Sequence, residues 1–211
     1  MRIVVIGSGF GGLAAAIRLQ AQGHQVTVLE QRDKPGGRAY VYEQDGYTFD
    51  GGPTIITAPS LIHELFALAG RKTEDYVSLV PISPYYNIRF GDGSVFRYDG
   101  DPALVAEEVR RFNPADVDGY HRFLAATDRI FTTGFALIDK PFLKLTDMLR
   151  VAPELVRLQS HKSVAQFVRG FFEDERLRQV FSFHPLLVGG NPFQTTSIYT
   201  LIHTLEQRWG V

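Results

Sequence analysis

The stretch IVVIGSGFGGLAAAIRLQAQGHQVTVLE, residues 3–30, decides the fold. An apolar run at 3–6 precedes a glycine-rich turn at 7–12, and an amphipathic segment follows as far as Gln22. A second apolar run at 26–29 ends in Glu30. Short apolar runs bounded by glycine indicate buried strands, and an amphipathic segment between them indicates a helix. The order predicts a strand, a glycine turn, a helix and a second strand, which together form a βαβ unit.

The glycines of this turn have the spacing of a dinucleotide-binding motif. Gly7 permits the tight turn, Gly9 lets the backbone approach a pyrophosphate, and Gly12 lets the helix pack against the strand. The helix N-terminus then faces the phosphates. Glu30 is placed to meet a ribose hydroxyl. The alternative is a glycine-rich turn in some other α/β protein. The predicted cofactor-binding residues of the turn are Gly7, Ser8, Gly9, Phe10, Gly11 and Gly12, with Ser8 serving through its backbone.

Composition excludes several classes of function. The chain has 211 residues and a formal net charge of −1, so nucleic acid is not an expected partner. It contains no cysteine, which excludes disulfides, thiolate catalysis and cysteine-bound metals and favours an intracellular setting. The six histidines lack the spacing of metal ligands, so we predict no metal site and a core or surface role for each. No apolar run is long enough to predict a membrane-spanning helix.

A second glycine loop follows Glu30 at 31–38 and contains Gly36, Gly37 and Arg38. The guanidinium of Arg38 has the donors to bind a pyrophosphate oxygen, although an ordinary solvent-exposed loop is the alternative. The first motif and its acid alone would also fit NAD. With the added Gly-Gly-Arg, the pattern resembles the FAD-dependent oxidoreductases that include the amine oxidases and the carotenoid desaturases. The additional predicted FAD-binding residues are Glu30, Gln31, Gly37, Arg38, and the turn Gly52, Pro53 and Thr54.

The rest of the chain mixes short strands with helices. Asp45-Gly46 between apolar segments predicts a β-hairpin, and Asp101-Pro102 predicts the start of a helix. Strands are expected at 39–43, 47–49, 77–82, 85–90 and 94–98. Helices are expected at about 60–69, 102–112, 115–132, 174–183 and 195–208, with further helical structure between 135 and 172.

The segment 135–172 interleaves apolar side chains with lysines and arginines. Basic amphipathic helices of this kind bind membrane surfaces, although a packed face opposite a solvated face gives the same pattern. A peripheral membrane contact is therefore one expectation for this segment.

Several later stretches make the chain similar to the bacterial-type phytoene desaturases, over its whole length. These stretches are residues 29–40 (LEQRDKPGGRAY), 147–150 (DMLR), 181–184 (FSFH) and 186–193 (LLVGGNPF). The resemblance implies a Rossmann-like FAD-binding domain, here 1–75, and an interleaved α+β, largely helical domain on the substrate and membrane side, here 76–211. Members of the family continue beyond the position of Val211, so the chain is expected to be an N-terminal portion and the fold incomplete.

The resemblance also implies the reaction. FAD accepts a hydride from an allylic carbon of a hydrophobic C40 polyene, which converts phytoene towards lycopene, and the enzyme is expected in the cytoplasm, peripheral on the membrane face. Asp147 and Arg150 share one helical face and are the candidate catalytic residues; from the residues alone, an exposed ion pair within the helix is the favoured alternative. Rival expectations are another flavin oxidoreductase of the amine-oxidase group and a non-catalytic dinucleotide-binding chain. The oligomeric state is not predicted.

Overall fold

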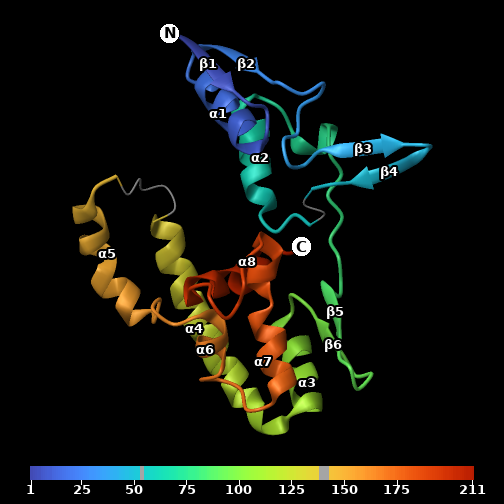
Figure 1. Cartoon of the computed structure of the whole chain (residues 1–211), viewed down its shortest axis with the longest axis vertical. Helices are drawn as coiled ribbons and strands as arrows, with labels where there is room; N and C mark the ends of the chain where they lie inside the picture. The colour runs from blue at the N-terminus through green and yellow to red at the C-terminus, as the bar shows by residue number, and fades with distance from the viewer. Residues whose placement is uncertain (53–54, 138–142) are drawn as a thin grey trace. The chain divides into compact units, whose positions relative to one another are not determined.

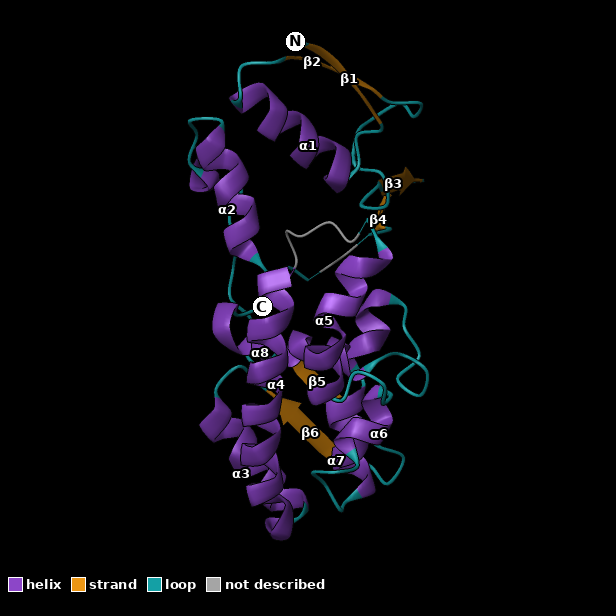
Figure 2. Cartoon of the chain, turned by 90° about the vertical axis from the view of Figure 1, so that its left-hand side faces the viewer, coloured by secondary structure: helices purple, strands orange, loops and turns teal. Residues whose placement is uncertain are grey.

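The computed structural model describes residues 1–52, 55–137 and 143–211. The chain divides into two units, Met1–Pro81 and Ile82–Gly210, and Figure 1 traces both. The first unit holds both glycine loops, and the second is mainly helical (Figure 2).

The first unit begins with the predicted strand, glycine turn, helix and strand. Strand β1 (Arg2–Ile6) lies parallel to β2 (Gln25–Leu29), and α1 (Phe10–Ala21) connects them. The two strands are in register from the Arg2–Gln25 pair to the Ile6–Leu29 pair. The N–H of Gly7 donates to the carbonyl of Leu29 over 2.7 Å, which ties the start of the glycine turn to the end of β2. The βαβ prediction is confirmed.

A hairpin and a second helix complete the regular structure of this unit. Strands β3 (Val41–Gln44) and β4 (Tyr47–Asp50) pair antiparallel across the predicted Asp45-Gly46 turn. Both turn residues have positive φ, 53° and 81°, as a tight hairpin of this kind requires. Helix α2 (Pro59–Leu68) contacts α1, and Arg18 makes two hydrogen bonds of 2.7 and 3.0 Å to the carboxylate of Glu64.

The second unit packs helices around a two-stranded antiparallel hairpin. The N-cap Asp101 accepts a hydrogen bond of 2.8 Å from the Ala103 N–H, as predicted for the first helix. The elements are β5 (Tyr86–Arg89), β6 (Val95–Tyr98), α3 (Pro102–Phe112), α4 (Val117–Leu137), α5 (Leu145–Arg157), α6 (Val164–Val168), α7 (Glu175–Ser182) and α8 (Leu201–Trp209), with short 3₁₀ helices η3 (His184–Val188) and η4 (Ser197–Thr200).

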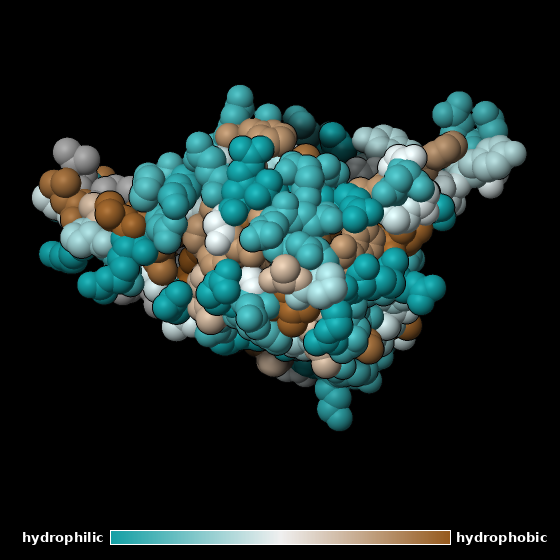
Figure 3. Space-filling model, turned by 90° about the horizontal axis from the view of Figure 1, so that it is seen from below, coloured by the Kyte–Doolittle hydropathy of each residue, from teal (hydrophilic) through white to brown (hydrophobic). Residues whose placement is uncertain are grey.

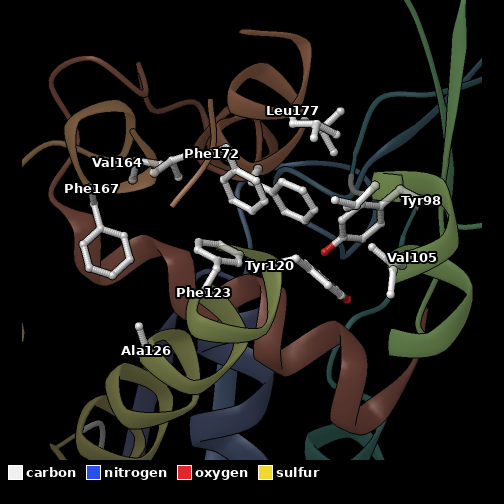
Figure 4. Close-up of a cluster of buried hydrophobic side chains, with 14 of the residues drawn as sticks. Tyr98, Val105, Tyr120, Phe123, Ala126, Val164, Phe167, Phe172 and Leu177 are labelled. Atoms are coloured by element: carbon white, nitrogen blue, oxygen red, sulfur yellow. The ribbon is translucent and has the colours of Figure 1, made fainter. Parts of the chain in front are cut away.

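The core of this unit is rich in aromatic side chains from β6, α4, α6 and α7 (Figure 4). The Phe172 and Phe181 rings stack with centroids 4.4 Å apart, and Phe123 contacts both rings. Asp116 accepts hydrogen bonds of 2.7 and 2.9 Å from the N–H groups of Glu173 and Asp174, so a buried carboxylate fixes the turn before α7.

Some predicted elements were wrong. The strand expected at 77–82 does not form, and the segment pairs with no strand in the described residues. Pro81 and Pro84 lack the N–H that a ladder needs, so apolar composition alone misled the prediction there. The helix expected at 195–208 forms over 197–209, but its first turn is the 3₁₀ helix η4, which continues directly into α8. The segment 135–172 contains the end of α4, then α5 and α6 with a non-helical connection between them, and 138–142 lie outside the described residues.

Within the ranges that the structure describes, no helix has both the length and the hydropathy to cross a membrane.

Candidate dinucleotide site

The two glycine loops lie directly against each other. Gly9 and Gly36 form an isolated parallel bridge, and the Gly36 N–H donates to the Ser8 carbonyl over 3.0 Å. A Cβ on Gly37 would lie 2.8 Å from the Gly9 Cα, closer than side chains permit. Gly37 therefore has to be a glycine because the two backbones are in contact, and this contact places Gly37 and Arg38 beside the turn of the first motif.

Gly7 and Gly12 shape the turn itself. Gly7 has a φ of +94°, in the region that favours glycine. A Cβ on Gly12 would lie 2.0 Å from the Gly7 carbonyl oxygen, so only glycine lets α1 start this close to β1. No side chain caps α1 at Gly9. The first N–H groups of a helix have no partner inside it, so those of Phe10, Gly11 and Gly12 are suited to an anion.

Glu30 is held at the end of β2 by three hydrogen bonds. Its Oε2 accepts from the Ser8 N–H (2.7 Å) and from the Ser8 hydroxyl (2.6 Å), and its Oε1 accepts from the Arg32 N–H (3.0 Å). These bonds, the Ser8 hydroxyl first among them, lower the pKa of Glu30 from 4.5 to about 2. The carboxylate is therefore ionised near neutral pH and is an acceptor for a ribose hydroxyl.

The remaining predicted residues of the second loop lie at its surface. Gln31 and Arg38 are exposed, and Arg38 makes no hydrogen bond or ion pair with any described residue. The neighbouring Arg32 bonds the Gly37 carbonyl over 3.3 Å and lies over the Tyr40 ring, with its guanidinium carbon 5.2 Å from the centroid. The Arg38 guanidinium is thus the one beside the glycines that is left available for a phosphate.

Gly52 packs on the chain that follows the second loop. A Cβ there would lie 2.5 Å from the Ala39 Cα and 2.9 Å from the Arg38 carbonyl oxygen. Close backbone packing explains this glycine, and it places Gly52 next to the backbone of Arg38. Pro53 and Thr54 lie outside the described residues.

Asp147 and Arg150 both lie in the first half of α5 in the second unit. The Asp147 carboxylate accepts a hydrogen bond of 3.0 Å from the Lys144 N–H at the start of the helix. None of the ion pairs among the described residues joins Asp147 to Arg150, and Arg150 is exposed. The carboxylate thus helps to start α5, and its catalytic role stays a prediction.

The sequence analysis did not predict three contacts that shape the dinucleotide site. The Ser8 hydroxyl binds Glu30 although we expected only its backbone to serve, the Arg32 N–H shares the same carboxylate, and Gly36 forms the bridge to Gly9. Gly36 was already named as part of the second glycine loop, and only its bridge to Gly9 was not predicted. The hydroxyl contact left no signal, since the two residues are 22 positions apart.

The geometry fits a dinucleotide with an unphosphorylated ribose. Among the described residues, backbone without side chains lines the predicted pyrophosphate position, and the unpaired N–H groups at the start of α1 and the unpaired Arg38 guanidinium lie beside it. The ionised Glu30 carboxylate lies at the predicted ribose position. The fold and the site therefore define a dinucleotide-binding α/β protein.

The family model described as "Flavin containing amine oxidoreductase" matches residues 10–211, and the chain belongs to this family. Proteins of this family contain a flavin, which supports the FAD cofactor predicted from the second glycine loop.

Curated relatives refine the position within the family. Phytoene desaturase (lycopene-forming) of Pantoea ananas is 58% identical over 208 residues, which are 98% of this chain and 42% of that protein. Phytoene desaturase (neurosporene-forming) of Rhodobacter capsulatus is 44% identical over 211 residues, 100% of this chain and 40% of that protein. The resemblance to phytoene desaturases is confirmed. The chain spans about two fifths of the length of these relatives.

Solved structures show the same fold at low sequence identity. A putrescine oxidase variant superposes with a TM-score of 0.59 at 19% identity and covers 96% of this chain and 42% of its own. Cyclohexylamine oxidase of Brevibacterium oxydans gives a TM-score of 0.57 at 24% identity, with 96% and 41% covered. These likenesses support the predicted α/β FAD-binding fold.

Proposed function

We propose that the protein carrying this chain is an FAD-dependent desaturase that converts phytoene, a C40 polyene, towards lycopene in carotenoid biosynthesis. The observation that carries the proposal is the 58% identity to a lycopene-forming phytoene desaturase across 98% of this chain. An identity this high along both units is not explained by a shared glycine motif alone.

The residues of this chain have positioning and electrostatic tasks in that reaction. FAD, when bound, supplies the acceptor for a hydride from an allylic carbon of the polyene. The bare backbone at Gly9 and Gly37 admits the pyrophosphate, Glu30 accepts a hydrogen bond from the adenosine ribose, and Arg38 binds a phosphate oxygen. Asp147 and Arg150 are the proposed groups for the proton that leaves the neighbouring carbon or for the charge that develops there.

A hydrocarbon substrate needs an apolar surface, since it has no charged group to bind. The second unit exposes such side chains on η3 and just after it: Leu186 is 60% exposed, Val188 60% and Phe193 71%. We assign the second unit, with its hairpin and helices, to the substrate side of the enzyme.

The same unit is proposed to contact the cytoplasmic face of a membrane through α5. Leu149 and Val156, each 63% exposed, lie seven residues apart on one stripe of this helix. Arg150 and Arg157 follow them by one position each, so long cationic side chains flank the apolar stripe. In Figure 3 hydrophobic side chains lie among hydrophilic ones at the left-hand end, on the side where Figure 1 places α5. A polyene dissolved in the bilayer would enter from there.

A product assay tests the function. The complete protein is purified, its flavin content is measured, and it is incubated with phytoene in liposomes, followed by chromatography of the extracted polyenes. We expect bound FAD and products with longer conjugation, and the product series will show whether the protein stops at neurosporene or reaches lycopene. Oxidation of primary amines without polyene turnover would contradict the proposal and favour an amine-oxidase activity. Bound flavin that no polyene reduces would favour a non-catalytic binding protein.

The membrane contact has its own test. Flotation with vesicles that contain anionic lipid should recover the complete protein, and Leu149→Glu should reduce the recovered fraction severalfold. Leu104→Glu is the matched control, because Leu104 is an exposed leucine, 54% accessible, on α3 of the same unit. Equal loss in both variants, or no loss in either, would contradict a contact through α5.

A further inference from the structure

The Ser8 hydroxyl and the Glu30 carboxylate form a short hydrogen bond within the dinucleotide site. They meet because Ile6 and Leu29 are paired at the ends of β1 and β2, and Ser8 and Glu30 follow these ends. Ser8 is only 4% exposed, so its side chain is fixed between the two strand ends. Its N–H and its hydroxyl both donate to the same oxygen, Oε2, over 2.7 and 2.6 Å.

Counting acceptor positions shows what the contact does. An ionised carboxylate offers about four positions for hydrogen bonds, two on each oxygen. Ser8 fills both positions of Oε2, and the Arg32 N–H fills one position of Oε1. Among the hydrogen bonds of the described residues, one position is left, on Oε1. The carboxylate is thus ionised and oriented, with one acceptor site still open.

We propose that Ser8 is a positioning residue for the cofactor: its hydroxyl holds the Glu30 carboxylate so that the open position of Oε1 receives a ribose hydroxyl of FAD. Ser8 occupies a position of the glycine motif at which the backbone conformation does not require a particular residue. The proposal therefore gives its side chain a role of its own. The direction of the pKa shift agrees, because the Ser8 hydroxyl is the largest cause that lowers the pKa of Glu30. The inference rests on FAD as the cofactor, as does the proposed function.

A double-mutant cycle tests this role. FAD affinity is measured by fluorescence titration of the deflavinated complete protein and of its Ser8→Ala, Glu30→Gln and doubly substituted forms. Ser8→Ala keeps the N–H and removes only the hydroxyl, so we expect FAD to bind roughly 3- to 10-fold more weakly. Because Ser8 acts through Glu30, we expect Ser8→Ala to have less than a twofold effect once Glu30→Gln is present. Ser8→Thr, which keeps a hydroxyl, should recover most of the affinity.

The chain supplies a matched control at Ser94. This serine also donates its N–H and its hydroxyl to one carboxylate oxygen, of Asp92, over 2.9 and 2.6 Å, but in the β5–β6 turn of the second unit. Ser94→Ala should leave FAD affinity unchanged.

The outcomes separate this inference from the proposed function. Unchanged or tighter FAD binding by Ser8→Ala, or an equal loss in the presence and absence of Glu30→Gln, would overturn the positioning role while leaving the desaturase proposal standing. Failure of the unsubstituted protein to bind FAD would overturn both. Normal FAD binding with the expected coupling, but no polyene turnover, would support the role of Ser8 and contradict the desaturase proposal.

Discussion

His184 and Glu206 face each other inside the core of the second unit, with Nε2 of the histidine 3.1 Å from Oε2 of the glutamate. The side chains are 2% and 0% exposed. Oε1 of Glu206 accepts a 2.8 Å hydrogen bond from the Tyr86 hydroxyl. One buried carboxylate therefore joins α8 to η3 and to β5, and its two oxygens both have partners.

We predict that Glu206→Ala destabilises the second unit by about 3 kcal/mol or more, because it leaves the buried His184 imidazole and the partly buried Tyr86 hydroxyl without their shared partner. Hydrogen exchange of the complete protein, read by mass spectrometry over α8 and β5, measures the local opening free energy. Glu107→Ala removes an exposed carboxylate that pairs with Arg110 on α3, and it should cost less than about 1 kcal/mol. Similar losses for the two variants would show that the buried contact is not a major source of stability.

The neighbouring His203 predicts how stability depends on pH. Its side chain is fully buried, hydrogen-bonded to the Tyr98 hydroxyl and surrounded by the rings of Tyr120, Phe123, Phe181 and His184. Burial, with a smaller contribution from the charge of His184, lowers the pKa of His203 well below 6.5. The unfolded chain therefore binds a proton that the folded unit does not.

It follows that the stability contributed by His203 is complete above pH 6.5 and decreases as the pH falls below it, by at most about 1.4 kcal/mol per pH unit for one proton. Opening free energies from hydrogen exchange at pH 7.5, 6.5 and 5.5 measure the slope. His203→Gln removes this titration and should flatten it, whereas substitution of the exposed His121 by Gln should not. Identical slopes in the three proteins would contradict the prediction.

Local patterns predicted the βαβ unit and the hairpin, because their determinants lie within a few residues. Gly12 is required by the carbonyl of Gly7, five positions earlier, and the reversal at Asp45-Gly46 depends only on the backbone of these two residues. Such relations are present in the spacing of the sequence itself.

The buried polar groups could not be predicted because their partners are distant in sequence. In the sequence, Glu206 is one of several polar residues of a short predicted helix, and nothing distinguishes it from the others. Its partners His184 and Tyr86 are 22 and 120 positions away. The run at 77–82 gave the opposite error, since it has the composition of a strand but pairs with none in the part of the chain that is described. In both cases the outcome depends on which distant residues or strands are available for pairing, and not on the local preference of the segment itself.

Alanine substitutions of Gly12 and Gly11 test the close approach of the start of α1 to the end of β1. Gly12→Ala places a Cβ 2.0 Å from the Gly7 oxygen and should separate α1 from β1, with loss of flavin retention. Gly11→Ala meets no atom within 4 Å and should stabilise the helix by up to about 1 kcal/mol with flavin retained. Flavin content and thermal unfolding of the complete protein measure both effects. Retained flavin in Gly12→Ala would show that the turn tolerates rearrangement.

Arg38 provides a test of the second glycine loop. Arg38→Ala should weaken FAD binding about tenfold or more, since a hydrogen bond to a charged group contributes roughly 1.5–3 kcal/mol. Arg71→Ala is the control, because Arg71 is an exposed arginine of the same unit outside both glycine loops. FAD titration of the deflavinated variants gives the comparison, and unchanged affinity in Arg38→Ala would exclude the pyrophosphate contact.

Asp147→Asn separates a catalytic role from a structural one. The asparagine oxygen can still accept the Lys144 N–H, so α5 should begin at the same place and flavin content should not change. If the carboxylate takes part in acid–base or charge-stabilising work, phytoene turnover should fall by about a hundredfold or more. Glu154→Gln, on the same helix, removes a carboxylate that pairs with Arg157 and should keep turnover near that of the unsubstituted protein. Full turnover in Asp147→Asn would leave helix initiation as the only role of this side chain and would move the search for the proton acceptor to other residues.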